Sequence, residues 1–339
     1  MLKSKDFATI QDVARVAGVS VSTVSRVLND KEDVAPSTYA RVKEVIAELS
    51  YTSSLAAKSL RSRKTNVIGL IVPDISASYS IEVMKGVNQA TTELGYDLIM
   101  YTCGDSTAKS WASREQKYIS LLNGGITDGI IIIAPTASTF PTTSPIVAID
   151  HHPGVIDLPT VIANNWDGSS SVVNYLLELG HRRIGFVGGR RDLQSSVRRY
   201  QGYADTLRQA GIPIDPALIE NGMFTLEGGY IAGRRLLDLE KRPSAIFATN
   251  DESALGIIKA AQDIGLKIPD DLSVVGFDNI PESAYYPPPT GLTTVDQGLH
   301  QKGVTATEML VKLIKGIALE QQVVKIPTKL VIRSSCRAI

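Results

Sequence analysis

Residues 9–29 read TIQDVARVAGVSVSTVSRVLN, and the fold of the N-terminal part of the chain can be predicted from them. Thr9 and Asp12 have the spacing of a capping box, which predicts the start of a helix. Gly18 ends this helix, and Ser20 is a preferred kind of N-cap for the next one. The stretch therefore predicts two short helices joined by a tight turn.

A third helix is predicted directly after this pair. Pro36 suits its first turn, where a missing N–H group costs nothing. Val42, Val45, Ile46 and Leu49 then recur at helical spacing and mark a buried stripe. Three short helices form a very small domain, which needs little core.

The first two helices fit a helix-turn-helix, which needs small residues where its helices pack and polar groups on the outer face of the second helix. Ala14, Gly18 and Val24 suit the packing positions. Serine hydroxyls hydrogen-bond unselectively, whereas an arginine can make a bidentate contact with guanine. The alternative is an ordinary helical bundle with a solvated face of serine and arginine. The residues predicted to face outward are Val21, Ser22, Ser25 and Arg26.

The charge of the chain is divided unevenly. The 339 residues carry 35 basic and 35 acidic side chains, a formal net charge of zero. Residues 1–65 hold eleven Lys or Arg and seven Asp or Glu, a net +4, so the remainder carries −4. A basic N-terminal segment followed by a mildly acidic remainder indicates a polyanion-binding module joined to another domain. A basic cluster without an intervening acid comprises Lys58, Arg61, Arg63 and Lys64.

From Asn66 onward, short β-branched runs alternate with longer amphipathic stretches, which predicts parallel sheets covered by helices. We therefore expect an α/β fold in which two doubly wound parallel-sheet subdomains follow the helical head and enclose a cleft. The first set of predicted strands comprises residues 67–72, 96–102, 128–134 and 146–150. The second set comprises residues 184–188, 245–249 and 273–277, with helices near 167–179, 197–210, 226–240 and 252–264.

Polar residues follow several of these strands. Ligands of such folds bind outside the carboxyl ends of the strands. The residues there suit a hydroxyl-rich ligand: Pro73 and Asp74, Asp150, Gly188 and Gly189, Asn250 and Asp251, and Asp278 and Asn279.

Several protein classes are disfavoured. No stretch approaches the ~18 consecutive apolar residues of a membrane span, and no signal-peptide pattern opens the chain, so we expect a cytoplasmic protein without a membrane partner. Cys103 and Cys336 form no CxxC pair and have no nearby His, so we expect no metal site. No GxGxxG, GxxxxGK[ST] or nucleophile-elbow motif is present, so we expect no cofactor and no enzyme activity.

The N-terminal string closely resembles the signature of the LacI/GalR family of transcriptional regulators. The resemblance rests on residues 9–20 and 23–29 and continues through a third helix that exits at Tyr51. It extends through LGHR at 179–182, ATND at 248–251, VGFD at 275–278, LTTV at 292–295 and LVIR at 330–333, and so covers essentially the whole chain. It implies a body that is similar to periplasmic binding proteins.

The resemblance also implies the domain boundaries. These are a helix-turn-helix domain at 1–52, a hinge helix and linker at 53–65, a first subdomain at 66–162 plus about 291–321, and a second subdomain at 163–290 plus about 322–339. In the family, the hinge helix pairs with that of its dimer mate in the minor groove of DNA. Leu60 matches the leucine that wedges between base steps. The alternative for this segment is a flexible basic linker.

The hinge departs from the family pattern, with Ser53 and Ser54 where Pro and Asn are frequent and Lys58 where Arg is usual. These departures weaken the preorganisation of the hinge and leave the wedge in place. The full set of predicted DNA contacts is Thr9, Val21, Ser22, Thr23, Ser25, Arg26, Asn29, Ala57, Lys58, Leu60 and Arg61.

The resemblance assigns effector-binding residues as well. Arg199 matches the ligand-clamping arginine of the family, whose guanidinium offers a fork of donors to vicinal hydroxyls. Phe224 falls where the family often has an aromatic residue over a sugar face. Each candidate also has a plain structural interpretation, as a surface charge, a turn former or a core residue. The full set is Tyr79, Asp150, Ser195, Arg199, Phe224, Asn250, Asp278 and Gln297.

Three features of the expected pocket depart from the family or add to it. Ala163 stands where Asp is frequent, and residues 77–80 read ASYS where NPFF is frequent, so we expect a smaller or differently shaped effector. Arg198 adds positive charge that suits a phosphorylated or acidic ligand; alternatively it is a solvated partner of Asp192 or Asp205.

The leading hypothesis is a homodimeric repressor on a pseudopalindromic operator, whose DNA affinity is controlled by a small effector. A sugar or sugar derivative is favoured over a purine or nucleoside. One alternative is a soluble sugar-binding receptor, which leaves residues 1–65 unexplained. The other is an enzyme on a Rossmann-like scaffold.

Overall fold

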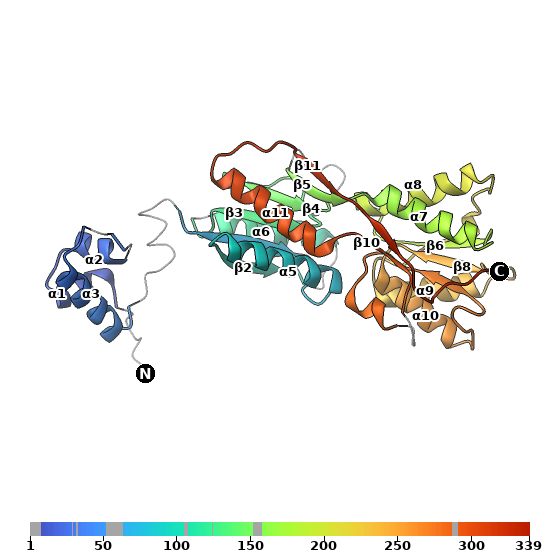
Figure 1. Cartoon of the computed structure of the whole chain (residues 1–339), viewed down its shortest axis with the longest axis horizontal. Coiled ribbons are helices and arrows are strands. Elements are labelled where there is room, and N and C mark those ends of the chain that lie inside the picture. The colour runs from blue at the N-terminus through green and yellow to red at the C-terminus, as the bar shows by residue number, and fades with distance from the viewer. Residues whose placement is uncertain are drawn as a thin grey trace. The chain divides into compact units, whose positions relative to one another are not determined.

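The computed structural model describes residues 8–28, 30–31, 33–51, 64–104, 108–123, 125–151, 158–286 and 291–339, with the backbone alone for 108–110. The chain forms two compact units, Met1–Thr65 and Asn66–Ile339 (Figure 1). Among the described residues, no helix has the length and apolar character that a membrane span requires.

The described part of the first unit contains helices α1 (Ile10–Ala17), α2 (Val21–Leu28) and α3 (Pro36–Glu48). The predicted capping box is confirmed, because Thr9 and Asp12 bond reciprocally at the start of α1. Ser20 Oγ accepts from the N–H of Thr23 at 3.1 Å and so caps α2. The three helices share a core made by Val13, Ala14, Ala17, Val24, Val27, Val42, Val45 and Tyr51.

The prediction that Gly18 occupies a packing position in the helix-turn-helix is wrong. Gly18 is exposed, and a Cβ atom there would meet only a side-chain atom of Arg41, at 3.5 Å. Gly18 has a φ of +67° as the C-cap of α1, a conformation that side chains disfavour. The glycine therefore turns the chain between α1 and α2, and the helices pack through Ala14 and Val24.

The first sheet of the second unit has six parallel strands in the order β11-β5-β4-β3-β1-β2. Its strands are β1 (Val67–Val72), β2 (Asp97–Thr102), β3 (Gly129–Ile133), β4 (Ile146–Ile149), β5 (Thr160–Ala163) and β11 (Val323–Ile326). Helices α5 (Ser78–Glu93) and α11 (Leu299–Ile314) pack together, and α6 (Ala108–Asn123) contacts β1 and β3. The central strands are apolar on both faces, which explains their continuous Ile/Val runs.

The second sheet has four parallel strands in the order β7-β6-β8-β9. They are β7 (Ile219–Asn221), β6 (Ile184–Gly188), β8 (Ala245–Ala248) and β9 (Ser273–Val275). Alternate strand residues enter two separate cores, and helices cover both faces. The helices are α7 (Asn165–Glu178), α8 (Gln194–Gln209), α9 (Leu226–Leu237) and α10 (Asp251–Gln262). The predicted α/β class with two parallel-sheet subdomains is confirmed.

The chain passes between the two sheets three times, after β5, before α11 and after β11 (Figure 1). Strands β10 (Thr294–Asp296) and β12 (Lys329–Val331), from the second and third passages, form an antiparallel pair. Parallel bridges join Val275 to Thr293 and Asp278 to Asp296, so this pair continues the edge of the second sheet.

Two of the sequence-based boundaries need correction. Leu292 and Val295, which were assigned to the first subdomain, are buried in the cores of the second. Residues 323–326, which were assigned to the second subdomain, form β11 and pair with β5 of the first sheet. β11 is a short, partly exposed edge strand whose apolar residues are interrupted by Lys325, so its apolar signal is weaker than that of the central strands.

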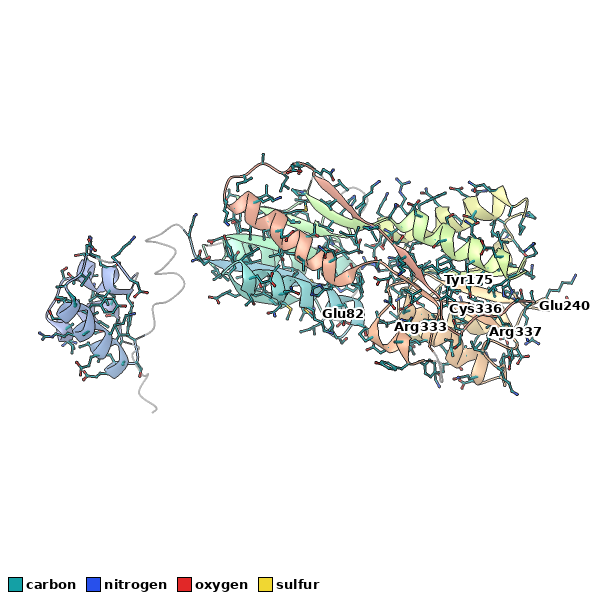
Figure 2. The ribbon with its side chains drawn as sticks, in the orientation of Figure 1. Glu82, Tyr175, Glu240, Arg333, Cys336 and Arg337 are labelled. Atoms are coloured by element: carbon teal, nitrogen blue, oxygen red, sulfur yellow. The ribbon has the colours of Figure 1, made fainter. Side chains whose placement is uncertain are left out.

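The C-terminal segment after β12 packs along the second subdomain, and Figure 2 labels Arg333, Cys336 and Arg337 on it. The Cys336 thiol is close to the carbonyl of Val274, at 3.4 Å. The N–H of Ile339 donates to the carbonyl of Leu179 at 2.9 Å. These contacts therefore hold the C-terminal segment against the second subdomain, after the chain has crossed between the subdomains for the last time.

Candidate functional site

The outer face of α2 presents the residues predicted to read DNA. Val21 is 41% exposed, although it is apolar and begins the helix. Ser22 and Arg26 are exposed, whereas Thr23 and Ser25 are half-buried. Of the other predicted contacts in this unit, Thr9 is the N-cap of α1, and Asn29, Ala57, Lys58, Leu60 and Arg61 lie outside the described residues.

Arg26 is held by an acidic residue from the segment that follows α2. Its Nε donates to Asp33 Oδ1 at 3.1 Å, and its Nη2 pairs with the other carboxylate oxygen. Both side chains are about half exposed, 53% and 52%. The guanidinium is therefore paired within the protein. This ion pair must break before Arg26 can contact a base.

In the second unit, Arg199 lies on α8 with its guanidinium buried between the two sheets. Its Nε donates to Asn165 Oδ1 at 2.8 Å, and its Nη2 donates to Gln297 Oε1 at 3.2 Å. Its Nη1 donates to the carbonyl of Thr249 and lies 3.5 Å from Asp278 Oδ1. All three guanidinium nitrogens of Arg199 therefore donate hydrogen bonds to protein groups.

A second buried cation, Lys302 of α11, lies on the side of the first subdomain. Its Nζ donates to Asp150 Oδ2 at 2.7 Å and to Gln297 Oε1 at 2.6 Å. Asp150 follows β4, and the same carboxylate oxygen accepts from the hydroxyl of Tyr79 on α5. Lys302 is fully buried, so its charge depends on these partners.

Gln297 joins the two cations. Its Oε1 accepts from both Arg199 and Lys302, and its Nε2 donates to Asp278. Gln297 lies between β10 and α11, on the second passage between the subdomains. We call the six interacting side chains the buried polar cluster: Tyr79, Asp150, Arg199, Asp278, Gln297 and Lys302.

Two aromatic rings lie close to the guanidinium of Arg199. The guanidinium carbon lies 3.8 Å from the ring centroid of Phe277 and 5.9 Å from that of Phe224. Phe224 has a φ of +64°, and a Cβ atom on Gly189 would lie 2.0 Å from its ring. Asn250 fixes this loop, because its Nδ2 donates to the Phe224 carbonyl at 2.9 Å while its Oδ1 caps α10.

Burial shifts the pKa values within the buried polar cluster. Burial raises the pKa of Asp278 well above its usual value, against the opposing effect of Arg199. Burial also acts to raise the pKa of Asp150, but the Lys302 ammonium and the Tyr79 hydroxyl outweigh it and the pKa is lowered. Asp150 is therefore the carboxylate that stays ionised with Lys302 as its partner.

A cavity of about 400 Å³ lies beside the buried polar cluster. Asp150 and Ala163 line it from the first subdomain, and Asn165 and Ser195 line it from the second. The Oδ1 atom of Asp150 is buried and accepts no hydrogen bond. Asp150 therefore keeps a carboxylate oxygen without a hydrogen-bond partner beside the cavity, and this oxygen is covered in this conformation.

Sequence reasoning found five of the six members of the buried polar cluster, and Ser195, Phe224 and Asn250 lie around it. It missed Lys302 and Asn165. The signal for Lys302 was present, because it shares a helical stripe with Leu299, Gly303 and Ala306, all of which are buried. A lysine at the centre of an apolar stripe indicates a buried ion pair.

Comparisons with known proteins agree along the chain. Residues 9–54 match the model of bacterial regulatory proteins of the lacI family, and residues 173–336 match the periplasmic binding protein-like domain. The chain is 33% identical to the HTH-type transcriptional repressor PurR of Histophilus somni, covering 98% of this chain and 100% of the relative. It is also 33% identical to the HTH-type transcriptional repressor CytR of Escherichia coli K12, covering 99% and 98%.

Solved structures give the same result. The lac repressor dimer bound to operator and the anti-inducer ONPF matches with a TM-score of 0.83 at 26% identity, covering 98% of this chain and 100% of that one. The transcriptional regulator CelR in complex with cellobiose matches with a TM-score of 0.72 at 29% identity, covering 97% and 99%. The helix-turn-helix unit, the two-sheet body and these full-length similarities together establish that the chain belongs to the LacI family of bacterial regulatory proteins.

Proposed function

We propose that the chain is a transcriptional repressor that binds operator DNA as a homodimer and whose affinity for the operator is controlled by a small effector. The observation that carries this proposal is the combination of an exposed α2 face with a cavity beside the buried polar cluster. A homodimer has twofold symmetry, which matches a pseudopalindromic operator. DNA binding also supports a cytoplasmic location.

The proposed effector is a polar, sugar-like molecule. Asn165 and Ser195 line the cavity with polar side chains, Arg199 fixes Asn165 from behind, and Asp150 keeps an oxygen without a partner, a combination that suits hydroxyl groups. The complex of CelR with cellobiose is a related structure with a sugar. A sugar receptor without DNA binding has no use for the helix-turn-helix unit, and the relatives carry repressor names rather than enzyme names.

An electrophoretic mobility assay tests DNA binding. The full chain is titrated onto DNA from upstream of its own gene and onto scrambled DNA of equal length, at several salt concentrations. We expect a sequence-selective shift that Arg26→Ala weakens by roughly 5–150-fold, the loss expected for one bidentate base contact. Arg208→Ala, on the exposed end of α8, serves as the matched control. Equal shifts of both DNAs would contradict the proposal.

Effector control is tested by repeating the titration with candidate sugars. A ligand that couples to DNA binding changes operator affinity by roughly 5–150-fold. Arg199→Met, which keeps the stem and removes the charge, should abolish that change. Operator affinity that no ligand alters would contradict the effector part of the proposal and leave DNA binding standing.

A further inference from the structure

Positively charged side chains line the cavity beside the buried polar cluster, and the described residues offer them no ion-pair partner. Two of its lining residues are cations, Arg198 of α8 and Lys325 of β11. Arg198 belongs to the second subdomain and Lys325 to the first, so the pair spans the cleft. Arg198 donates to Gln201 Oε1, a neutral group, at 3.0 Å. No described residue forms an ion pair with either cation.

The charges deeper in the site do not neutralise this pair. Asp150 already faces Lys302 at 2.7 Å, and Asp278 already faces Arg199. The inner carboxylates therefore leave no excess of negative charge, and Arg198 and Lys325 remain as an excess of positive charge along the cavity. An anion on a ligand would meet these two cations, and the one carboxylate that lines the cavity, that of Asp150, is already paired with Lys302.

The start of α8 adds partial positive charge at the same place. Gln194 and Ser195, its first two residues, both line the cavity. The N-cap residue of this 16-residue helix is Leu193, which makes no side-chain cap hydrogen bond. Unsatisfied N–H groups at a helix start favour a negatively charged group.

A second, independent observation indicates the other end of the ligand. Asp150 is only 7% exposed, and its Oδ1 has no hydrogen-bond partner although the residue lines the cavity. A buried carboxylate oxygen without a donor costs free energy, which a hydroxyl of a ligand would recover. The volume of about 400 Å³ lies near the lower end of the range for small-molecule sites, roughly 300–1,000 Å³. This size suits a single sugar ring.

We propose that the effector is an anionic monosaccharide derivative, a sugar phosphate or a sugar acid, whose anionic group binds Arg198, Lys325 and the start of α8 while a hydroxyl donates to Asp150. This inference rests on the proposed function, because it names the class of effector for the same site. It assigns Arg198 and Lys325 as the residues that select a charged ligand over its neutral parent.

Thermal unfolding of the full chain tests the anion subsite without DNA. The melting temperature is measured in sodium phosphate, sodium acetate and sodium chloride at equal ionic strength. We expect phosphate or acetate to raise the melting temperature above that in chloride by roughly 2–4 °C, the shift that tenfold saturation of one weak site gives a domain of this size. The anion that acts more strongly separates a phosphorylated effector from a carboxylated one.

Variants show whether this effect comes from the cavity. The double variant Arg198→Gln/Lys325→Gln should lose the anion-specific rise, while Arg208→Gln/Lys329→Gln, exposed cations that do not line the cavity, should keep it. Glucose 6-phosphate and gluconate should also stabilise the wild type more than glucose does, and the double variant should remove this preference.

Three results would overturn the inference: no anion-specific rise in the wild type, an equal rise in the Arg198/Lys325 double variant, or stabilisation by glucose equal to that by its anionic derivatives. None of these measurements depends on DNA. Failure of the anion subsite is therefore distinguishable from failure of operator binding, which the mobility assay reports separately.

Discussion

At the scale of single residues, the pair of Arg26 and Asp33 sets how readily the α2 face meets DNA. The carboxylate holds the guanidinium through two atoms, and both side chains are about half exposed. An exposed ion pair of this kind contributes about 0.2–1 kcal/mol. Arg26 must give up that stabilisation before it can contact a base, so Asp33 lowers operator affinity by a small factor.

We therefore predict that Asp33→Asn tightens operator binding by up to about fivefold, because the amide no longer competes for Arg26. The measurement is the operator dissociation constant in a fluorescence anisotropy titration. Glu44→Gln is the matched control, since it removes one exposed acid from α3 of the same unit. If both variants tighten binding equally, the effect comes from net charge rather than from release of Arg26.

A second residue with a distinct effect is Asp251, the first residue of α10. It is completely buried, and burial raises its pKa from 3.8 to about 7. Its carboxylate accepts from the N–H of Ile280 at 3.0 Å and from the hydroxyl of Thr294. Gly276 leaves room for it, because a Cβ atom there would lie 2.1 Å from Asp251 Oδ1.

The raised pKa predicts how stability changes with pH. Between about pH 4 and pH 7 the folded chain keeps the Asp251 proton that the unfolded chain has lost, so this group's contribution to stability falls as the pH rises through that window. Asp251→Asn cannot titrate. We expect the melting temperature of the wild type, measured relative to that of Asp251→Asn, to decrease by several degrees from pH 4 to pH 7. A constant difference between the two proteins would contradict the shifted pKa.

The sequence predicted the polar residues at strand ends because strand ends can be recognised from apolar runs. Asp150 and Asp278 follow such runs directly, and both belong to the buried polar cluster. The partners of a side chain are harder to predict, because they depend on the packing of segments far apart in the chain. Arg26 illustrates this: its exposure was predictable from helical spacing, whereas its pairing with Asp33 depends on the path of the chain after α2.

At the scale of elements, α5 and α11 make the closest helix contact in the first subdomain. A Cβ atom on Gly86 would lie 1.9 Å from the carbonyl oxygen of His300, and one on Gly303 would lie 2.2 Å from that of Val83. Two glycines thus allow the helix backbones to touch. This contact matters for the site, because α5 carries Tyr79 and α11 carries Lys302.

We predict that Gly303→Ala destabilises the chain by about 1–3 kcal/mol, because the added methyl group forces α11 away from α5. The measurement is denaturant unfolding followed by circular dichroism. Gln301→Ala is the matched control, since Gln301 lies on the exposed side of α11. A stability loss equal in both variants would show that the close contact is not responsible.

Elements with strong apolar patterns were predictable, and the weakly patterned ones were not. Strands β1, β3 and β6 were predicted to within a residue at each end, because each is a buried Ile/Val run or a run flanked by glycine. Strand β5 was missed although it is mostly buried, and the edge strands β7 and β11 were missed too. β7 and β11 are short and only partly buried, and the charged residues Glu220 and Lys325 interrupt their apolar residues.

At the scale of the whole molecule, apolar packing and specific polar contacts join the two subdomains of the body across the cleft. Gln297 accepts from Lys302 of the first subdomain and from Arg199 of the second. At another point of the cleft, the guanidinium carbon of Arg190, which follows β6, lies 4.4 Å from the ring centroid of Trp111 on α6. Because this contact bridges the two subdomains, we expect opening of the cleft to separate Arg190 from Trp111.

The fluorescence of Trp111 should therefore report whether the cleft is open or closed. The chain has two tryptophans, and the other, Trp166, bonds through its Nε1 to Asp205 within the second subdomain, so opening of the cleft leaves that bond intact. The variant Trp166→Phe makes Trp111 the sole tryptophan. Its fluorescence and its quenching by acrylamide then follow the distance between the subdomains, independently of DNA and of the effector's identity.

In that background we predict that Gln297→Leu opens the cleft, because leucine fills a similar volume and can neither accept from the two cations nor donate to Asp278. Quenching of Trp111 by acrylamide should rise, and Arg190→Ala should raise it similarly by exposing the ring without disturbing Gln297. Gln301→Leu on the exposed side of α11 is the control and should change nothing. If Gln297→Leu leaves the quenching of Trp111 unaltered, Gln297 does not hold the subdomains together, and other contacts across the cleft, such as that of Ser78 with Glu252, must do so.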